Sequence, residues 1–247
     1  MMKATGVSVF SEAEQLLHNI TLDIPDGKAT VIIGGSGSGK SLLLKTLAYI
    51  RPPEQGSVLW QDQKLGKISE EALRRVRRQW GFMFQDSALW ANMTVFDNLA
   101  LPVRFHYPHL SDADVLKRVQ HVVDAVGFED SLMQRPVAFS AGKQKILSFM
   151  RAIVNDPQFL FLDEPSTFVD RSAFMPIVRI LQRYRREKRT LLMVTHEIDL
   201  ARNLGDYLCI VRNGSIAAFG PLAELMESNN PEIRREIIES FQQEDDE

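Results

Sequence analysis

The sequence predicts an α/β fold in which a parallel β-sheet is preceded by an antiparallel β portion and interrupted by a helical insertion. Short apolar runs separated by glycine, proline and aspartate indicate strands within the first 60 residues. Apolar residues then recur with the helical period of about 3.6 between residues 111 and 126. Two later buried-strand runs, residues 159–162 and 191–195, flank a helical stretch, which implies a right-handed parallel crossover.

Composition narrows the class of protein. A chain of 247 residues with 45% hydrophobic and 25% charged residues is typical of globular proteins, which excludes disordered, collagen-like and coiled-coil classes. The net charge of -3 gives no general attraction to nucleic acid or anionic lipid. The single cysteine, Cys209, excludes an intramolecular disulfide and fits a reducing compartment. The apolar runs are far shorter than the ~18 residues that cross a bilayer, and residues 1–10 do not resemble a secretory signal, so we expect a cytoplasmic protein.

The first half of the chain is expected to hold strands at residues 7–10, 20–24, 30–33 and 57–60. Asp26-Gly27 is a hairpin-type turn signal between two of these runs. The first long helix is expected to begin after Ser111, which forms a capping pattern with Asp114, and to end at Gly127.

The second half is expected to continue with a helix that reaches about Lys188 between the two buried strands. A β pair at residues 207–211 and 215–219 follows, turned by the hairpin dipeptide Asn213-Gly214. The last expected helix covers residues 231–241, and the charged residues 242–247 are predicted to be a solvated end.

A glycine-rich segment follows the strand at residues 30–33 and opens a leucine-rich helix. It matches the pattern G-x-x-x-x-G-K-[ST], whose glycines let successive N–H groups point at a phosphate while the helix N-terminus adds partial positive charge. We expect Lys40 to neutralise β and γ oxygens and Ser41 to give an oxygen to Mg²⁺. The motif predicts a P-loop NTPase (RecA-like) core, with the predicted nucleotide-binding residues Gly34, Gly35, Ser36, Gly37, Ser38, Gly39, Lys40 and Ser41.

Polar side chains follow three runs of the predicted sheet. An apolar strand that ends in Asp-Glu commonly means only a turn, but beside a phosphate loop we assign Asp163 to Mg²⁺ and Glu164 to the water that attacks the γ-phosphate. His196 is expected to donate a hydrogen bond to the γ-phosphate, although a lone histidine is more often a surface or core residue. Gln85, after the run 81–84, offers an amide to Mg²⁺ or water.

These residues together resemble the nucleotide-binding subunits of ABC transporters over essentially the whole chain. The order of the motifs is similar to that of the family. An upstream aromatic residue (Phe10) precedes the phosphate loop (34–41), a glutamine loop (Gln85) and a signature segment (139–143). The acidic strand (159–164), a D-loop (167–170) and a switch histidine (His196) follow. The resemblance implies that Phe10 stacks on the adenine of ATP. It also implies that Ser140 and Gly142 of one subunit close on the ATP of a second subunit in a head-to-tail homodimer.

The signature departs from the family's L-S-G-G-Q, because it is Phe139-Ser140-Ala141-Gly142-Lys143 in this chain. Ala141 adds a Cβ where a backbone approaches phosphate, and Lys143 replaces a neutral amide by a cation. Leu42 stands where Thr or Ser is usual after the phosphate loop, among the residues assigned to the nucleotide. Since Glu164 and His196 are kept, we expect a working ATPase whose turnover these changes can slow; a nucleotide-sensing module without hydrolysis is the alternative.

Residues 84–102 resemble the ATPases of MCE-type lipid transporters, the MlaF-like group. The resemblance implies phospholipid or lipid transport, whereas amino-acid-uptake and lipoprotein-export ATPases share a looser pattern and remain alternatives. It implies a separate integral-membrane permease, an MCE substrate-binding protein, a small regulatory subunit and a peripheral position on the cytoplasmic face of the inner (plasma) membrane. We expect no nucleic-acid partner, because the DNA-maintenance and translation-factor classes need a coiled-coil insertion or two cassettes.

The family resemblance also predicts how the chain is divided. We expect one ATPase domain with a nucleotide-binding core at residues 1–85 and 155–225, a helical subdomain at 86–154, and a C-terminal helix with an acidic tail at 226–247. In this family the stretch after the glutamine binds a coupling helix of the permease. The alternative is that Trp90, Met93 and Phe96 are buried in the chain's own core.

Overall fold

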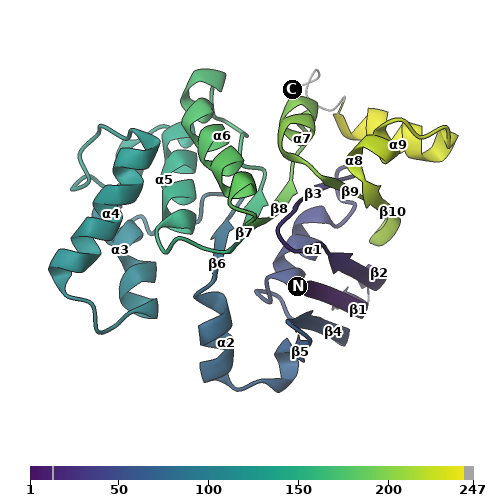
Figure 1. Cartoon of the computed structure of the whole chain (residues 1–247), viewed down its shortest axis with the longest axis horizontal. Helices are drawn as coiled ribbons and strands as arrows, with labels where there is room; N and C mark the ends of the chain where they lie inside the picture. Colours follow the sequence, from purple (N-terminus) through teal and green to yellow (C-terminus); the bar gives the residue numbers. More distant parts are fainter. Residues whose placement is uncertain (13, 242–247) are drawn as a thin grey trace.

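The computed structural model describes residues 1–12 and 14–241, and within them two β-sheets organise the fold (Figure 1). The smaller, antiparallel sheet has the order β2-β1-β4-β5, with β1 at Met2–Ser11, β2 at Glu14–Ile24, β4 at Gln55–Trp60 and β5 at Gln63–Lys64. The larger sheet has the order β10-β9-β3-β8-β7-β6, with β3 at Ala29–Ile33, β6 at Trp80–Met83, β7 at Phe159–Asp163, β8 at Thr190–Val194, β9 at Tyr207–Arg212 and β10 at Ser215–Pro221. Its strands are parallel except β10, which pairs antiparallel with β9.

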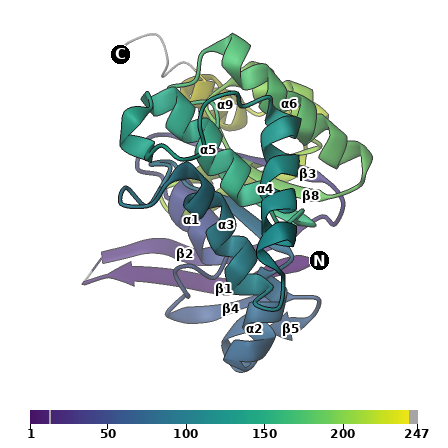
Figure 2. The ribbon, with the colours of Figure 1, turned by 90° about the vertical axis from the view of Figure 1, so that its left-hand side faces the viewer.

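Helices cover both faces of the larger sheet. They are α1 Lys40–Leu47, α2 Glu70–Arg77, α3 Val95–His106, α4 Asp112–Val126, α5 Ala141–Ile153, α6 Arg171–Arg186, α7 Ile198–Leu204, α8 Leu222–Met226 and α9 Pro231–Phe241, with 3-10 turns at Leu65–Lys67 and Pro136–Ala138. Figure 2 shows α3, α4 and α5 together on one side of the molecule, with the antiparallel sheet below them. Within the described ranges, 1–12 and 14–241, no helix has the length and apolar character that crossing a membrane requires.

The larger sheet is buried on both faces, as parallel sheets generally are. Leu160 and Leu162 of β7 face the core formed with α3–α6, while Phe159 and Phe161 face the core that contains α1 and the antiparallel sheet. Leucines of α1 fill the space between the two sheets. Cys209 of β9 lies in this second core and is fully buried, and burial raises the pKa of its thiol to about 12.

Local sequence signals account for the ends of the helices. The hydroxyl of Ser111 accepts a hydrogen bond from the amide of Asp114 at 3.2 Å, and Gly127 ends α4 in a left-handed conformation with φ 72°. Side chains of Ser69, Thr94, Ser140 and Asp170 cap α2, α3, α5 and α6 in the same way. The predicted helix at 111–126 is therefore confirmed, together with the parallel crossover from β7 through α6 to β8.

Two predicted turns differ in outcome. Asn213-Gly214 joins β9 to β10 as a hairpin, with Ser215 opposite Arg212. The hairpin interpretation of Asp26-Gly27 is wrong, because this turn carries the chain from β2 in the antiparallel sheet to β3 in the parallel sheet. The dipeptide specifies a reversal in the backbone, whereas the pairing of the flanking strands is decided by burial: all five residues of β3 are buried, as a central parallel strand requires.

Candidate active site

The phosphate-loop residues 34–41 connect β3 to α1. The ammonium of Lys40 donates hydrogen bonds to the carbonyls of Gly34 and Gly35, at 2.8 and 2.9 Å. The Lys40 side chain is therefore folded back within the loop, and the residue is buried. Burial lowers the pKa of Lys40, while the charges of Glu164 and Asp163 oppose that shift.

Two glycines give the loop its shape. Gly34 has φ 151°, and a Cβ there would lie 2.1 Å from the carbonyl oxygen of Val211, so no other residue fits against β9. Gly37 has φ 71°, and no heavy atom lies within 4 Å of the position that a Cβ would take there. The loop is thus closely packed against β9 at Gly34 and open at Gly37, where main-chain N–H groups can approach a phosphate.

The side chains of Ser41 and Asp163 are in contact at the carboxyl ends of the parallel strands. The hydroxyl of Ser41 donates to Oδ1 of Asp163 at 2.7 Å, while Oδ2 is buried without a hydrogen-bond partner among the described residues. Burial raises the pKa of Asp163, and the Ser41 hydrogen bond and the Lys45 ammonium, 4.0 Å from Oδ2, oppose that shift. An unpartnered carboxylate oxygen beside a hydroxyl fits Mg²⁺, which prefers oxygen ligands and keeps several waters.

Mg²⁺ is usually bound by one or two carboxylates and several waters, and the site offers it few protein ligands. In residues 1–12 and 14–241 no group of three or more His, Cys, Asp or Glu side chains is arranged to hold a metal. Gln85 follows β6 and is exposed. Because Met83 pairs with Leu162, Gln85 emerges at the same sheet edge as Asp163, but within the described chain its side chain has no hydrogen bond. Its assignment to the metal stays a prediction.

Glu164 and His196 form a pair at the ends of β7 and β8. Nε2 of His196 lies 2.8 Å from Oε1 of Glu164, and Nδ1 lies 3.1 Å from the carbonyl oxygen of Ser240 in α9. Glu164 is buried with φ 50°, and its amide donates to the carbonyl of Val194 at 3.1 Å. The hydrogen bond to Glu164 raises the pKa of His196, against desolvation. The predicted base and the predicted switch histidine are therefore in contact.

Lys145 of α5 is a functional candidate that the sequence reasoning missed. The residue is 1% exposed, and its ammonium donates to the carbonyl of Glu164 at 2.8 Å. Burial lowers its pKa, opposed by the charges of Asp163, Glu164 and Asp86. A cation four residues before the buried Phe149 lies on the apolar face of the helix, and that pattern is the sequence signal for a buried lysine.

Two further residues, Phe10 and Leu42, are assigned by family resemblance to the adenine ring and to the nucleotide, and they lie on different elements. Phe10 is half-buried near the end of β1, opposite Gln15. Leu42 packs its side chain against the core between the sheets, so it can offer a nucleotide only its main chain. Both assignments stay predictions.

The signature segment lies at the start of α5. The Ser140 hydroxyl caps the helix by accepting from the Lys143 amide at 3.3 Å. Gly142 is packed so closely that a Cβ there would lie 2.5 Å from the carbonyl oxygen of Phe168 in the D-loop. The Lys143 ammonium forms an ion pair with Asp130 at 2.7 Å, so its charge is drawn away from the helix start. In the described part of the chain, neither Ser140 nor Gly142 hydrogen-bonds the phosphate loop, and their contact with the ATP of a second subunit stays a prediction.

A groove of about 520 Å³ lies beside the segment that follows Gln85. Trp90, Leu101 and Phe105 line it, and these side chains are exposed by 58%, 36% and 57%. Met93 and Phe96 are half-buried. The alternative in which Trp90 is buried in the chain's own core is therefore wrong, whereas Phe96 does pack in part against that core.

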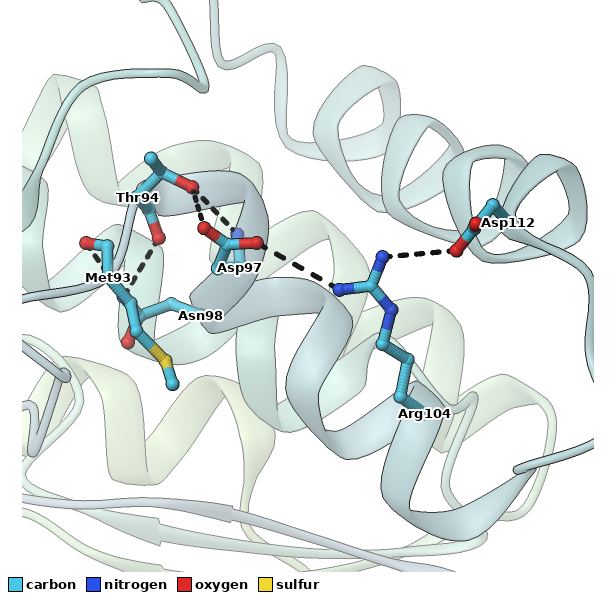
Figure 3. Close-up of polar contacts among 6 residues, drawn as sticks. All are labelled: Met93, Thr94, Asp97, Asn98, Arg104 and Asp112. Atoms are coloured by element: carbon cyan, nitrogen blue, oxygen red, sulfur yellow. Dashed lines mark hydrogen bonds and ion pairs between the residues drawn. The ribbon is translucent and has the colours of Figure 1, made fainter.

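A buried asparagine, Asn98, holds the loop before α3, and Figure 3 shows its contacts with Met93 and Thr94. Asn98 is 1% exposed; its Oδ1 accepts from the Trp90 amide at 2.8 Å, and its Nδ2 donates to the carbonyls of Trp90 and Thr94 at 3.1 and 2.9 Å. Thr94 caps α3 and donates to Asp97 at 2.6 Å. Thr94 and Asn98 thus fix the start of α3 and the loop before it.

Comparisons with known proteins agree with this arrangement. Residues 17–167 match the ABC transporter family. The chain is 31% identical over 245 residues to the methionine import ATP-binding protein MetN 1 of Yersinia pestis bv. Antiqua (strain Antiqua), covering 97% of this chain and 71% of that protein. It is also 31% identical to a probable ribonucleotide transport ATP-binding protein, mkl, of Mycobacterium leprae (strain TN), covering 95% of this chain and 67% of that protein.

A solved structure is similar in fold and sequence. The ATP-binding cassette MJ0796, solved as a dimer in a post-hydrolysis state with ADP and Pi, superposes with a TM-score of 0.83 and 27% identity, over 90% of this chain and 99% of that chain. The predicted α/β class, with an antiparallel sheet and a helical portion beside the main sheet, is confirmed by this likeness. The family match covers more than half of the residues, and the chain therefore belongs to the ABC transporter family as an ATP-binding subunit.

Proposed function

We propose that this chain binds ATP at residues 34–41 and hydrolyses it to power a separate membrane permease. The observation that carries the proposal is the pair formed by Glu164 and His196, whose side chains meet at 2.8 Å at the sheet edge that also presents Lys40 and Asp163. A buried carboxylate beside a phosphate loop is suited to orient and polarise water, and a neighbouring imidazole is suited to donate to a phosphate oxygen.

The proposed roles follow from the contacts. Lys40 neutralises phosphate charge, Ser41 and Asp163 hold the metal with Gln85 as a further ligand, Glu164 orients water, and His196 donates to the terminal phosphate. Mg²⁺, when bound, supplies neutralisation of phosphate charge. Most of the rate enhancement comes from positioning and charge stabilisation, because phosphoryl transfer requires little covalent chemistry from the protein.

The functional unit we propose is a head-to-tail homodimer. Ser140 is exposed, whereas Gly142 is half-buried against the D-loop at Phe168. A second copy brings these groups to the nucleotide of its partner, and the dimer of the MJ0796 cassette supports this arrangement. Binding of ATP then joins the two chains, and hydrolysis releases them.

For the substrate, we infer amino-acid uptake ahead of lipid transport. The relatives named for methionine import support the amino-acid alternative. The lipid inference rests on the resemblance of residues 84–102 to MCE-type ATPases alone, and an MCE substrate-binding protein or a small regulatory subunit has no support among these relatives. Purification of the complex with its permease, followed by transport of labelled methionine or labelled phospholipid in proteoliposomes, separates the two. Phospholipid transport without methionine transport would overturn our preference.

The permease is proposed to bind in the groove beside Trp90, which residues of a helical subdomain at 86–154 line together with β6. Residues 1–85 and 155–225 form the proposed nucleotide-binding core, and residues 226–247 the C-terminal helix and tail, of which 242–247 lie outside the described residues. The exposed aromatic side chains of Trp90 and Phe105 support a partner at this groove. We propose that the chain lies peripherally at the cytoplasmic face of the inner membrane, where the permease would hold it.

Hydrolysis is tested by Glu164→Gln, which keeps the shape of the side chain and removes its basicity. We expect the kcat for ATP to fall by about 10²–10⁴ while ATP binding is retained, because general-base catalysis has that size. Phosphate release and fluorescent-nucleotide binding measure the two quantities. If the native chain binds ATP but has no Glu164-dependent hydrolysis, the nucleotide-sensing alternative is correct.

A further inference from the structure

The last helix, α9, ends beside the catalytic pair. Ser240 is fully buried and Ile237 is nearly so, and Phe241 packs against the core formed with α3–α6. Arg212 of β9 reaches two glutamates of α9, Glu236 at 3.4 Å and Glu232 at 3.7 Å. The final turn of α9 is therefore seated on the molecule by apolar contacts and by charge, which fixes the direction of its terminal carbonyl groups.

A helix leaves its last four carbonyl groups without partners within the helix. Ser240 is the last residue but one of α9, so its carbonyl belongs to this set. That carbonyl oxygen lies 3.1 Å from Nδ1 of His196. The partial negative charge at the helix C-terminus favours a cationic imidazole at this place.

The two ring nitrogens of His196 thus face two acceptors. Nε2 faces the carboxylate of Glu164 and Nδ1 faces the carbonyl of Ser240. A carbonyl oxygen cannot donate a hydrogen bond, so the contact at Nδ1 requires a proton on that nitrogen. The hydrogen bond at Nδ1 also fixes the plane of the ring, because a rotation about the Cβ–Cγ bond would break it.

We propose that the main-chain carbonyl of Ser240 is a positioning group for His196: it holds Nδ1 protonated and directs Nε2 toward Glu164 and the terminal phosphate, so that seating of α9 controls hydrolysis. This rests on the proposed ATPase function and adds a control element to it. Other charges near the ring are those of Glu164 and Lys40. Residues that contact α9 from a partner protein would act on turnover through this single contact.

The test is a pair of substitutions at one position in the full chain. Ser240→Pro removes the amide of residue 240 and clashes with the carbonyl of Glu236, which displaces the final turn. Ser240→Ala removes the hydroxyl bond to Glu236, at 2.6 Å, but leaves the main-chain carbonyl in place. We expect Ser240→Pro to lower kcat for ATP by about tenfold with KM within twofold, because losing a hydrogen bond to a charged group has an effect of that size. We expect Ser240→Ala to keep kcat, because it leaves the main-chain carbonyl in place.

Ring ¹⁵N chemical shifts of His196 give a reading that lost stability alone does not produce. In the native chain and in Ser240→Ala we expect a protonated, hydrogen-bonded Nδ1, and in Ser240→Pro its loss. Equal kcat in the two variants, or an unprotonated Nδ1 in the native chain, would overturn the proposal. The native-chain spectrum decides even if Ser240→Pro fails to fold. Full activity of Glu164→Gln would instead overturn the proposed function itself.

Discussion

Two buried lysines hold the main chain of the site through their ammonium groups. Lys40 bonds to the carbonyls of Gly34 and Gly35 inside the phosphate loop, and Lys145 bonds to the carbonyl of Glu164. Neither ammonium lies within hydrogen-bond distance of a carboxylate in the described chain. Because both charges are already desolvated, we infer that each is poised to respond to a negative charge brought into the site.

Lys145→Met is predicted to lower the kcat for ATP by about tenfold, because the main chain at Glu164, which has a positive φ, loses its hydrogen bond. The KM for ATP should stay within twofold, because the phosphate loop is untouched. Steady-state phosphate release measures both constants. Lys117→Met, at an exposed position of α4 away from the site, is the matched control and should change neither. An increase in KM without loss of kcat would contradict the positioning role.

Stability should depend on pH through His196. Its folded-state pKa is raised above the ordinary 6.5, chiefly by the hydrogen bond to Glu164, so the folded state binds the proton more tightly than the unfolded state does. The stabilisation is fully present below pH 6.5 and is lost as the pH rises through the folded-state pKa. The free energy of unfolding of the native chain minus that of His196→Gln should therefore fall as the pH rises above the ordinary pKa of about 6.5.

Urea denaturation at each pH measures this difference. His121→Gln, at an exposed position of α4, gives the control for removal of an imidazole. A difference between the native chain and His196→Gln that is constant over this range would show that the imidazole gains no proton affinity in the fold.

At the scale of elements, the start of α3 illustrates how one side chain organises the surface proposed to bind the permease. Asn98 satisfies both the amide and the carbonyl of Trp90, so it sets the shape of the loop as well as the start of the helix. Arg104 of the same helix joins Asp97 at 3.9 Å and Asp112 at 3.2 Å, which links α3 to α4 at the surface. Exposed pairs of this kind contribute little to stability, so the buried asparagine is the more important contact.

Asn98→Ala is predicted to lower the free energy of unfolding by about 1–3 kcal/mol, because main-chain groups of Trp90 lose their partners. Basal ATP hydrolysis should be retained in folded protein, while stimulation by the permease should be lost. Urea denaturation and ATPase assays with and without the permease measure these effects. The exposed Asn92, in the same loop, provides the control through Asn92→Ala. Full stimulation of Asn98→Ala would show that this loop does not transmit the signal.

Elements with local signals were predictable from the sequence. The phosphate loop, α4 and the β9–β10 hairpin are each specified by residues a few positions apart, such as Ser111 with Asp114. The contacts that complete the site join residues far apart in the chain: Lys145 with Glu164, and His196 with Ser240. No local pattern encodes such a pair, because it depends on how α5 and α9 pack against the sheet. The partner strand of β3 was not predictable from Asp26-Gly27 for the same reason.

At the scale of the whole molecule, the nucleotide residues and the apolar groove lie on separate surfaces joined by α5. The N-terminal side of this helix carries Ser140, its middle bonds Glu164 through Lys145, and Arg151 near its end donates to the carbonyls of Ser87 and Ala88 beside the groove. A displacement of α5 therefore changes both surfaces together, which would connect the proposed permease contact physically with hydrolysis.

Trp90→Ala is predicted to weaken binding of the permease by at least about 30-fold, the effect of losing an aromatic anchor worth ~2 kcal/mol at an interface. Basal ATP hydrolysis should be unchanged, because the side chain is exposed and lies outside the active site. Co-purification in detergent and titration of the permease against the ATPase rate measure these effects. Leu116→Ala removes a side chain of α4 that is 50% exposed and serves as control. Unchanged affinity of Trp90→Ala would place the permease elsewhere.

The burial of Cys209 has a practical consequence for following these motions. It is the single cysteine of the chain, and a thiol that is fully enclosed between the two sheets, with a pKa of about 12, reacts slowly with maleimides or spin-label reagents. New cysteines at exposed positions, one in the groove and one near the D-loop, can therefore be labelled selectively in the native background. Distances between such labels would report the tilt of α5 during a catalytic cycle without any change to the interior.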